Sequence, residues 1–336
     1  MTSGETSLRK TNSARISATG SYLPTKVLTN EDLAGMVDTS DEWIRERTGI
    51  RERRVAADDQ AASDLAYEAA VRALDAAAVA GRDLDAVLVG TVCSDYLFPA
   101  TACILQEKIG ATNAFAYDFA AACSGFIYGL GQARAYIESG MCKRILLVGV
   151  ETLTKLVDWT DRNTCVLFGD GAGAVIVEAG REGEGILSVH MRSDGGLADL
   201  IMLPAGGSRL PITAQLLADR ENKIHMRGNE TFKLAVKAMG SALEIAIRDA
   251  GVTQEDIDLL IPHQANIRII QALGKRLEVS EDKVYVNLDR YGNTSAATIP
   301  IAIDEALRAG RIGPGSCVAM AAFGSGATWG AAVVRL

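Results

Sequence analysis

The strongest constraint on the fold of this 336-residue chain is an internal repeat. Residues 168–172 read Phe-Gly-Asp-Gly-Ala and lead into the run Val-Ile-Val, and residues 323–327 read Phe-Gly-Ser-Gly-Ala and lead into Val-Val. A helical pattern over residues 64–80, with an apolar run after it, is echoed over residues 232–250 at a similar spacing. Phe-Gly-x-Gly alone is a common strand-and-turn signal, but the two echoes together predict two related halves that meet near residue 180.

Strand-like and helix-like segments alternate along the chain. Apolar strand-like runs are separated by longer stretches of helical periodicity and lie at residues 84–90, 145–150, 172–177, 259–261 and 317–322. This alternation predicts a layered α/β fold. Because such sheets bind ligands where strand ends meet, we expect a cleft at the boundary between the two halves.

The composition narrows the class of protein. A chain of this length that is 48% hydrophobic can bury a large core. Acidic residues outnumber basic ones by 42 to 34, and the net charge of −8 argues against nucleic acid or an anionic membrane as the main partner. The polar first ten residues, and the lack of an apolar run of roughly 18 residues, predict a cytoplasmic protein. The six cysteines form no Cys-x-x-Cys pair, so we expect reduced thiols and no metal centre.

Cys123 is the most informative position for chemistry. A strand-like stretch over 114–120 ends just before the motif Ala-Ala-Cys-Ser-Gly-Phe, and a helical pattern over 126–137 follows. A thiol at the first turn of a helix is a candidate nucleophile, because free N–H groups and the helix dipole favour the thiolate. We therefore expect a pKa below the value of about 8.5 for free cysteine. The alternative is a structural core cysteine, since this residue type is commonly buried.

Two further polar positions suit the same chemistry. His263, one of three histidines, stands directly after a buried strand in the motif Ile-Pro-His-Gln-Ala-Asn. Asn293 lies in Tyr-Gly-Asn-Thr-Ser-Ala-Ala, which opens a helical pattern over 299–309. A core histidine bonded to a carbonyl and an asparagine that caps a turn or helix are the alternatives. A thiol, an imidazole and a carboxamide donor together can stabilise an enolate.

These three motifs, in this order and spacing, resemble those of β-ketoacyl-ACP synthase III, the condensing enzyme that initiates type II fatty acid synthesis. The similarity extends through residues 20–24, 41–44, 47–50 and 168–174 and the Gly-rich terminal loop, and it covers nearly the whole chain from residue 15 onward. The resemblance implies a thiolase-type α/β fold of two duplicated halves in five layers (αβαβα). We expect a polar leader at 1–14, an N-terminal half at 15–180 with the cysteine, and a C-terminal half at 181–336 with the histidine and asparagine. The resemblance also implies a homodimeric acyltransferase without a cofactor.

The family's reaction is a two-stage Claisen condensation. By resemblance, Cys123 attacks the thioester of an acyl-CoA, and the backbone N–H groups of Cys123 and Ser325 form the oxyanion hole. Malonyl-ACP then loses carbon dioxide, and His263 and Asn293 hold the enolate oxygen before its carbon attacks the acyl-cysteine. Thiolases need a second cysteine as a base, and no plausible one is apparent here, although Cys317 lies near the terminal loop.

The resemblance also assigns binding positions. Coenzyme A and its pantetheine arm would contact Trp43, Arg47, Arg162, Gly228, Asn229, Phe232 and Arg268. An acyl carrier protein would dock on a basic patch of Lys233, Arg268, Lys275 and Arg276. Ordinary surface ion pairs for the arginines and a half-buried helix aromatic for Trp43 are the alternatives.

The acyl pocket would end at Phe98, reaching across the dimer, and at Phe323. A bulky ring at Phe98 predicts a short starter, whereas a role in the dimer core alone is the other interpretation. Ser325 departs from the three glycines common in acetyl-specific members, and this weakens the prediction of the starter.

Other functions are weighed against this hypothesis. A synthase-III-like chain could transfer its acyl group to oxygen or condense starters for secondary metabolism. An inactive binding module is disfavoured by the intact Cys123, His263 and Asn293. A thiol hydrolase would need the histidine positioned as a base toward the thiol.

Overall fold

The computed structural model describes residues 13–181 and 183–336. Most of the predicted polar leader therefore lies outside the described residues. Ser13 and Ala14, which that prediction included, are the first two residues of strand β1.

The first sheet has five strands in the order β1-β7-β6-β4-β5. β7 runs antiparallel to both β1 and β6, whereas β6, β4 and β5 are parallel to one another. The strands span Ser13–Tyr22 (β1), Asp170–Gly180 (β7), Arg144–Thr152 (β6), Ala86–Gly90 (β4) and Phe115–Phe119 (β5).

The second sheet repeats this arrangement with four strands in the order β8-β13-β12-β11. β13 is antiparallel to β8 and β12, β12 is parallel to β11, and a parallel bridge from Leu260 to Val284 takes the place that β5 has in the first sheet. The strands span Gly185–Ser193 (β8), Thr328–Arg335 (β13), Cys317–Gly324 (β12) and Leu259–Pro262 (β11). The duplication predicted from the sequence repeat is confirmed.

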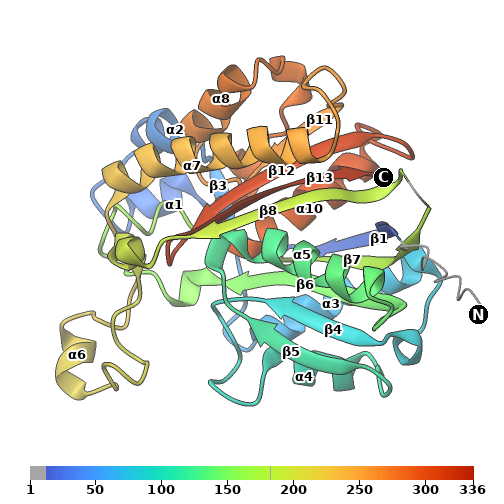
Figure 1. The fold of residues 1–336 in the computed structure, drawn as a ribbon. Coiled ribbons are helices and arrows are strands. Elements are labelled where there is room, and N and C mark those ends of the chain that lie inside the picture. The colour runs from blue at the N-terminus through green and yellow to red at the C-terminus, as the bar shows by residue number, and fades with distance from the viewer. Residues whose placement is uncertain (1–12, 182) are drawn as a thin grey trace, which may run out of the picture.

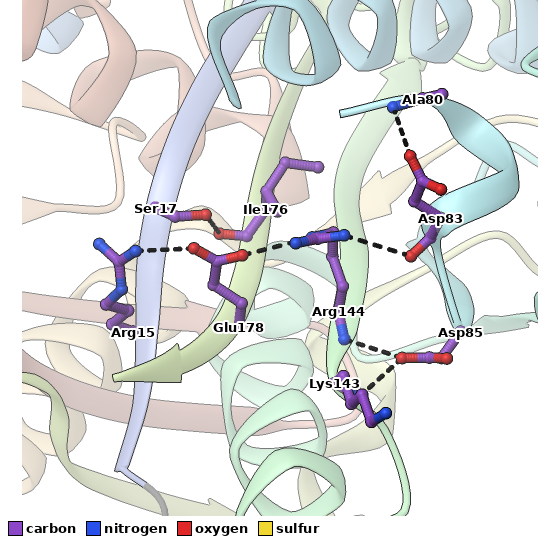
Figure 2. A network of polar contacts seen from close by, with 9 residues as sticks. All are labelled: Arg15, Ser17, Ala80, Asp83, Asp85, Lys143, Arg144, Ile176 and Glu178. Carbon is purple, nitrogen blue, oxygen red and sulfur yellow. Dashed lines mark hydrogen bonds and ion pairs between the residues drawn. The ribbon is translucent and has the colours of Figure 1, made fainter. Parts of the chain in front are cut away.

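One aspartate holds the same place in each half. The Asp85 carboxylate, just before β4, accepts hydrogen bonds from the backbone N–H groups of Lys143 and Arg144 at the start of β6 (Figure 2). Asp258, just before β11, likewise accepts the N–H of Cys317 at 2.8 Å. Each carboxylate ties the beginnings of two neighbouring parallel strands together.

Helices form three layers around the two sheets (Figure 1). The outer layers are α3 (Ala62–Ala77) with α4 (Thr101–Lys108) on the first sheet, and α7 (Gly228–Asp249) with α8 (Ile267–Arg276) on the second. Between the sheets lie α5 (Gly125–Glu138) and α10 (Thr298–Arg308). The core around these two central helices contains buried residues of both halves, so the halves share one interior.

The remaining helices and strands lie at the end of the sandwich where the parallel strands β4, β5, β6, β11 and β12 end. They are β2 (Lys26–Thr29), α1 (Asn30–Ala34), α2 (Asp41–Thr48), β3 (Glu52–Val55), β9 (Ile201–Met202), β10 (His225–Met226) and α9 (Leu288–Tyr291), with α6 (Ala214–Ala218) on an excursion away from the body (Figure 1). Arg53 of β3 is fully buried and donates to the carbonyls of Leu28 and Val166 and to the Asn30 side chain. Among the residues described, no helix is long and apolar enough to cross a membrane.

Candidate active site

Two equivalent turns of the duplicated fold meet at the centre of the molecule. Cys123 lies in the short 3-10 helix η2 (Ala122–Ser124), between β5 and α5, and its counterpart η6 (Ser295–Ala297) precedes α10. Ala122 and Ser295 both have a left-handed backbone, with φ of 45° and 48°. Such angles are uncommon outside glycine and often mark functional turns.

The cysteine, the histidine and the asparagine share one cavity of about 910 Å³. Cys123 enters it from η2, His263 from the loop after β11, and Asn293 from the loop before η6. The cavity lies where the two halves meet, as expected for duplicated α/β sheets. It is also lined by Trp43, Arg47, Gly228, Asn229, Phe232, Lys233, Arg268, Phe323 and Ser325.

The Cys123 thiol has a higher pKa than its position at a helix start suggested. Its pKa is raised to about 12, mainly by burial and in part by the nearby Glu151 carboxylate, while the neighbouring Ser295 and Asn293 side chains lower it. The expectation of a lowered pKa is thus wrong for the free protein, because removal from water outweighs the dipole of a helix end. The thiol must lose its proton during the reaction.

His263 is fixed through one of its two ring nitrogens, Nδ1. Its Nδ1 lies 2.7 Å from the Thr298 hydroxyl, which is also 2.9 Å from the carbonyl oxygen of Ser295. The hydroxyl donates its one proton to the Ser295 carbonyl, so an N–H donor at the other ring nitrogen, Nε2, requires this proton to turn to Nδ1. Burial lowers the His263 pKa to about 3, so the ring is neutral at physiological pH.

Asn293 is oriented by its own loop. Its Oδ1 accepts the backbone N–H of Ser295 at 2.8 Å, and its backbone N–H donates to the carbonyl of Leu167 at 2.8 Å. With Oδ1 occupied, the amide nitrogen is left to donate toward the Cys123 sulfur. The side chain is 7% exposed, so this donor acts in a site largely closed to water.

The terminal Gly-rich loop lies against the nucleophile. A Cβ placed on Gly324 would come within 2.7 Å of the backbone nitrogen of Cys123. The next residue, Ser325, lines the cavity, and its hydroxyl donates to the carbonyl of Ile201. The loop therefore brings the backbone of residues 324–325 beside the Cys123 N–H, as the predicted oxyanion hole requires.

An aromatic ring and two arginines gather at the cavity rim. The guanidinium carbons of Arg47 and Arg162 lie 4.4 Å and 5.0 Å from the centre of the Trp43 ring. Arg162 also donates to the backbone carbonyl of Asp38 and pairs with its carboxylate. Arg268 of α8 donates to the carbonyl of Glu46, which ties α8 to α2 at this rim.

Four predicted site residues lie outside the cavity lining. Arg162 stays at the rim on Trp43, and Lys275 is exposed near the end of α8. Arg276 folds back onto α7, where its guanidinium pairs with Glu244 at 2.8 Å. Phe98 is 85% exposed on the surface of its own chain.

Cys317 is far from the site. It opens β12, whereas the cavity lies beyond the other end of that strand, at Gly324. Seven residues of extended strand span roughly 23 Å. Cys317 is therefore no counterpart of a thiolase's second cysteine.

Sequence reasoning missed three residues that contact the site: Glu151, Ser295 and Thr298. Glu151 is fully buried and accepts from the Ser295 hydroxyl at 3.0 Å. Its signal was present in the sequence, because a charged residue directly follows the apolar run 145–150, just as His263 follows its strand. Within the described part of the chain, no group of three or more His, Cys, Asp or Glu side chains could hold a metal ion.

Comparison with known proteins agrees with this geometry. Residues 117–195 match the family model described as 3-oxoacyl-[acyl-carrier-protein (ACP)] synthase III, and residues 247–336 match the model of its C-terminal part. A β-ketoacyl-[acyl-carrier-protein] synthase III of Caldanaerobacter subterraneus subsp. tengcongensis is 53% identical over 322 residues, covering 96% of this chain and 97% of the relative.

Solved structures show the same fold. The crystal structure of a β-ketoacyl-[acyl carrier protein] synthase III from Thermus thermophilus has a TM-score of 0.89 and 47% identity, covering 96% of this chain and 99% of that one. The priming β-ketosynthase of the R1128 polyketide pathway has a TM-score of 0.90 and 33% identity, covering 97% and 96%. The five-layer thiolase-type fold is thereby confirmed, and the chain belongs to the β-ketoacyl-[acyl-carrier-protein] synthase III family.

Proposed function

We propose that this chain condenses a short acyl-CoA starter with malonyl-ACP and thereby initiates type II fatty acid synthesis. The observation that carries the proposal is the convergence of Cys123, His263 and Asn293 on one cavity. Membership of the synthase III family supports the same acyltransferase chemistry. None of the three residues alone distinguishes this reaction from other thiol chemistry, but the set does.

In the first stage, the Cys123 sulfur attacks the carbonyl carbon of the acyl-CoA. The carbonyl oxygen gains negative charge, which the backbone N–H groups of Cys123 and Ser325 meet as donors. The C–S bond to coenzyme A then breaks, and the acyl group remains on Cys123. Donors fixed in advance in a dry site typically contribute about 3–4 kcal/mol each to stabilising such a charge.

In the second stage, malonyl-ACP loses carbon dioxide, and its thioester becomes an enolate. The Asn293 amide and the Nε2–H of neutral His263 donate to the enolate oxygen. This assignment requires the Thr298 proton to point at Nδ1 of His263. The enolate carbon then attacks the acyl group, and Cys123 leaves as a thiolate.

The cavity rim suits the two carriers of acyl groups. At this rim, the base of coenzyme A would stack on Trp43. Its phosphates would lie near the guanidinium groups of Arg47 and Arg162. Gly228, Asn229 and Phe232 at the start of α7 would contact the pantetheine arm.

Lys233 and Arg268 form the part of the basic patch that lies at the cavity, where an acidic carrier protein would dock. Lys233→Glu should raise the KM for malonyl-ACP more than the KM for acyl-CoA. Lys237→Glu, on the same helix but outside the cavity lining, is the matched control. Equal rises in both KM values for Lys233→Glu contradict the docking site.

A second copy of the chain would complete the acyl pocket. Tyr96, Leu97 and Phe98 are 63%, 89% and 85% exposed, and they follow β4, the neighbour of edge strand β5. An apolar cluster of this kind marks an interface, and a homodimer would cover it. Phe98 of each copy would then close the other's pocket, so we expect acetyl-CoA to be used much faster than decanoyl-CoA.

The reaction as proposed needs no cofactor, because acyl-CoA and malonyl-ACP supply both carbon groups. A cytoplasmic location is supported by six free thiols, which suit a reducing compartment.

Mass spectrometry of Cys123 after mixing with acyl-CoA thioesters tests the nucleophile and the starter together. Release of carbon dioxide from malonyl-ACP, and its dependence on the acylated enzyme, tests the condensation. We expect an acyl adduct on Cys123 and none on the other five cysteines. Failure of Cys123 to become acylated by any acyl-CoA would overturn the proposal.

Condensation of a starter for secondary metabolism is the second candidate. The 33% identity to the priming β-ketosynthase of the R1128 polyketide pathway supports this second candidate. Assay with carrier proteins of the two kinds of pathway separates the two candidates.

A further inference from the structure

Glu151 is the buried titratable group nearest the nucleophile that the reaction above does not use. It lies near the carboxyl end of β6, is 0% exposed, and stands behind the cavity wall rather than in its lining. Its carboxylate accepts hydrogen bonds from the Val92 N–H at 3.1 Å, the Thr91 hydroxyl at 3.2 Å and the Ser295 hydroxyl at 3.0 Å. Each of these donors is neutral, and no ion pair among residues 13–181 and 183–336 includes Glu151.

Ser295 connects this carboxylate to the sulfur. Its hydroxyl donates to Oε1 of Glu151, and Ser295 lines the same cavity as Cys123, where η6 packs against η2. A hydroxyl that donates its only proton to a carboxylate can still accept one from an S–H group. The left-handed backbone of Ser295 fixes this bridging position.

Proton transfer through Ser295 would avoid placing two negative charges in the site. Ionising the thiol while Glu151 stays ionised would place two negative charges side by side away from water, which is strongly unfavourable. Moving the thiol proton to Glu151 keeps a single negative charge in the site. The dipole of the helix start is insufficient to ionise the thiol here, because burial outweighs it.

We propose that Glu151 accepts the Cys123 proton through the Ser295 hydroxyl as the acyl group is transferred, an inference that rests on the acyl-transfer function proposed above. As sulfur attacks the acyl carbon, the S–H bond breaks and its proton joins the Ser295 oxygen. The proton of Ser295 passes to Oε1 of Glu151. When the bond to coenzyme A breaks, the same path returns a proton toward the departing thiolate, so Glu151 ends the step ionised. Glu151 acts only through Ser295 and is thus a positioning residue.

Other titratable groups face Glu151 from the neighbouring elements. Cys93, just past β4, lies near Glu151, and its pKa is raised well above the ordinary value by burial and by the Glu151 charge. Asp170, the first residue of β7, is also buried, but its carboxylate is held by Thr154 and by the Ala56 N–H. Cys123 is therefore the group that can exchange a proton with Glu151 through a hydroxyl, and burial raises the Glu151 pKa to about 7, close to working pH.

The test is the pH dependence of Cys123 acylation by acetyl-CoA in Glu151→Gln, Glu151→Asp and Ser295→Ala, each compared with wild type by rapid quench and mass spectrometry. General base catalysis typically contributes about 10²- to 10⁴-fold, so we expect Glu151→Gln to acylate about 100-fold more slowly at pH 8. At pH 5.5, where wild-type Glu151 is itself protonated, the deficit should shrink to a few-fold. Ser295→Ala should show the same pattern, the double variant should add little, and Glu151→Asp should recover part of the rate.

Pure charge repulsion predicts the opposite sign. Without a relay, removing the Glu151 charge makes the thiol easier to ionise, so Glu151→Gln would react as fast as or faster than wild type at pH 8. That result, or an equal deficit at all pH values, overturns the relay. Alkylation by iodoacetamide at the same pH values repeats the comparison without acyl transfer. If iodoacetamide alkylates wild-type Cys123 but no acyl-CoA acylates it, the proposed function is refuted. The alkylation rates of the variants then still test the relay.

Discussion

Replacing Gly324 by alanine should damage the nucleophile's half of the site and leave the enolate's half nearly intact. Gly324 does not have a left-handed backbone, so alanine is compatible with its φ. The new Cβ, however, would lie 2.7 Å from the backbone nitrogen of Cys123 and 3.1 Å from that of Ser124, where ordinary contacts begin at 3.4 Å. One backbone must therefore move by about 0.7 Å. A misplacement of about 1 Å costs on the order of 10²-fold in rate, so we expect Cys123 acylation to fall about 30- to 100-fold.

The assay separates the two halves of the reaction. Quench-flow mass spectrometry measures acylation of Cys123, and release of carbon dioxide from malonyl-ACP without acyl-CoA measures the step proposed for His263 and Asn293. Overpacking should also lower the free energy of unfolding by about 1–3 kcal/mol. Gly313→Ala, at a site where a Cβ meets nothing within 4 Å, is the control. Acylation of Gly324→Ala at the wild-type rate would refute the argument that this contact positions the oxyanion hole.

Three further predictions follow from the structure. His263→Ala and Asn293→Ala should each lower decarboxylation of malonyl-ACP by about 10²- to 10³-fold, because each removes one donor to the enolate, while acylation of Cys123 by acetyl-CoA is largely retained; equal losses in both steps would contradict their assignment. Burial raises the Glu151 pKa from 4.5 to about 7, so the folded chain holds this proton more tightly than the unfolded chain. The resulting contribution to the free energy of unfolding is about 3 kcal/mol; it is fully present below pH 4.5 and is lost as the pH rises through 7. Urea unfolding from pH 5 to pH 8 should therefore show a smaller loss of stability in Glu151→Gln than in wild type, and parallel curves would contradict the raised pKa. Arg53→Ala should lower the free energy of unfolding by about 3 kcal/mol or more, because three oxygens, two of them in buried hydrogen bonds, lose their donor. A loss below about 1 kcal/mol would show that water replaces the guanidinium.

Local sequence patterns predicted the layered α/β class and the two related halves, whereas the five-layer arrangement was predicted from the family resemblance. The helical pattern at 126–137 corresponds to α5, Gly125–Glu138, and the apolar run at 145–150 lies inside β6, Arg144–Thr152. The repeat predicts that the two sheets share one strand order, but the order itself was seen only in the structure. The three proposed catalytic positions stood out in the sequence because each follows a predicted strand or precedes a predicted helix.

Properties that depend on distant partners could not be predicted. The Cys123 pKa is set by burial and by Glu151 and Ser295, which come from other parts of the chain. Arg276 was assigned to a docking patch from its charge, but its direction depends on Glu244, 32 residues earlier. Phe98 can close a pocket only with a second copy, which one sequence does not place. Glu151 could have been found by applying to β6 the strand-end rule that identified His263.

The central helices α5 and α10 also determine how this chain could be divided. Each is followed or preceded by strands of its own half, yet both are wrapped in a core built jointly by the two halves. A cut in the connection between β7 and β8 would leave two fragments, one bearing the sulfur and the other the imidazole and amide. Neither fragment could bury its inner helix alone, so activity would return only when the two fragments associate. The fold could therefore serve as the basis of a split reporter.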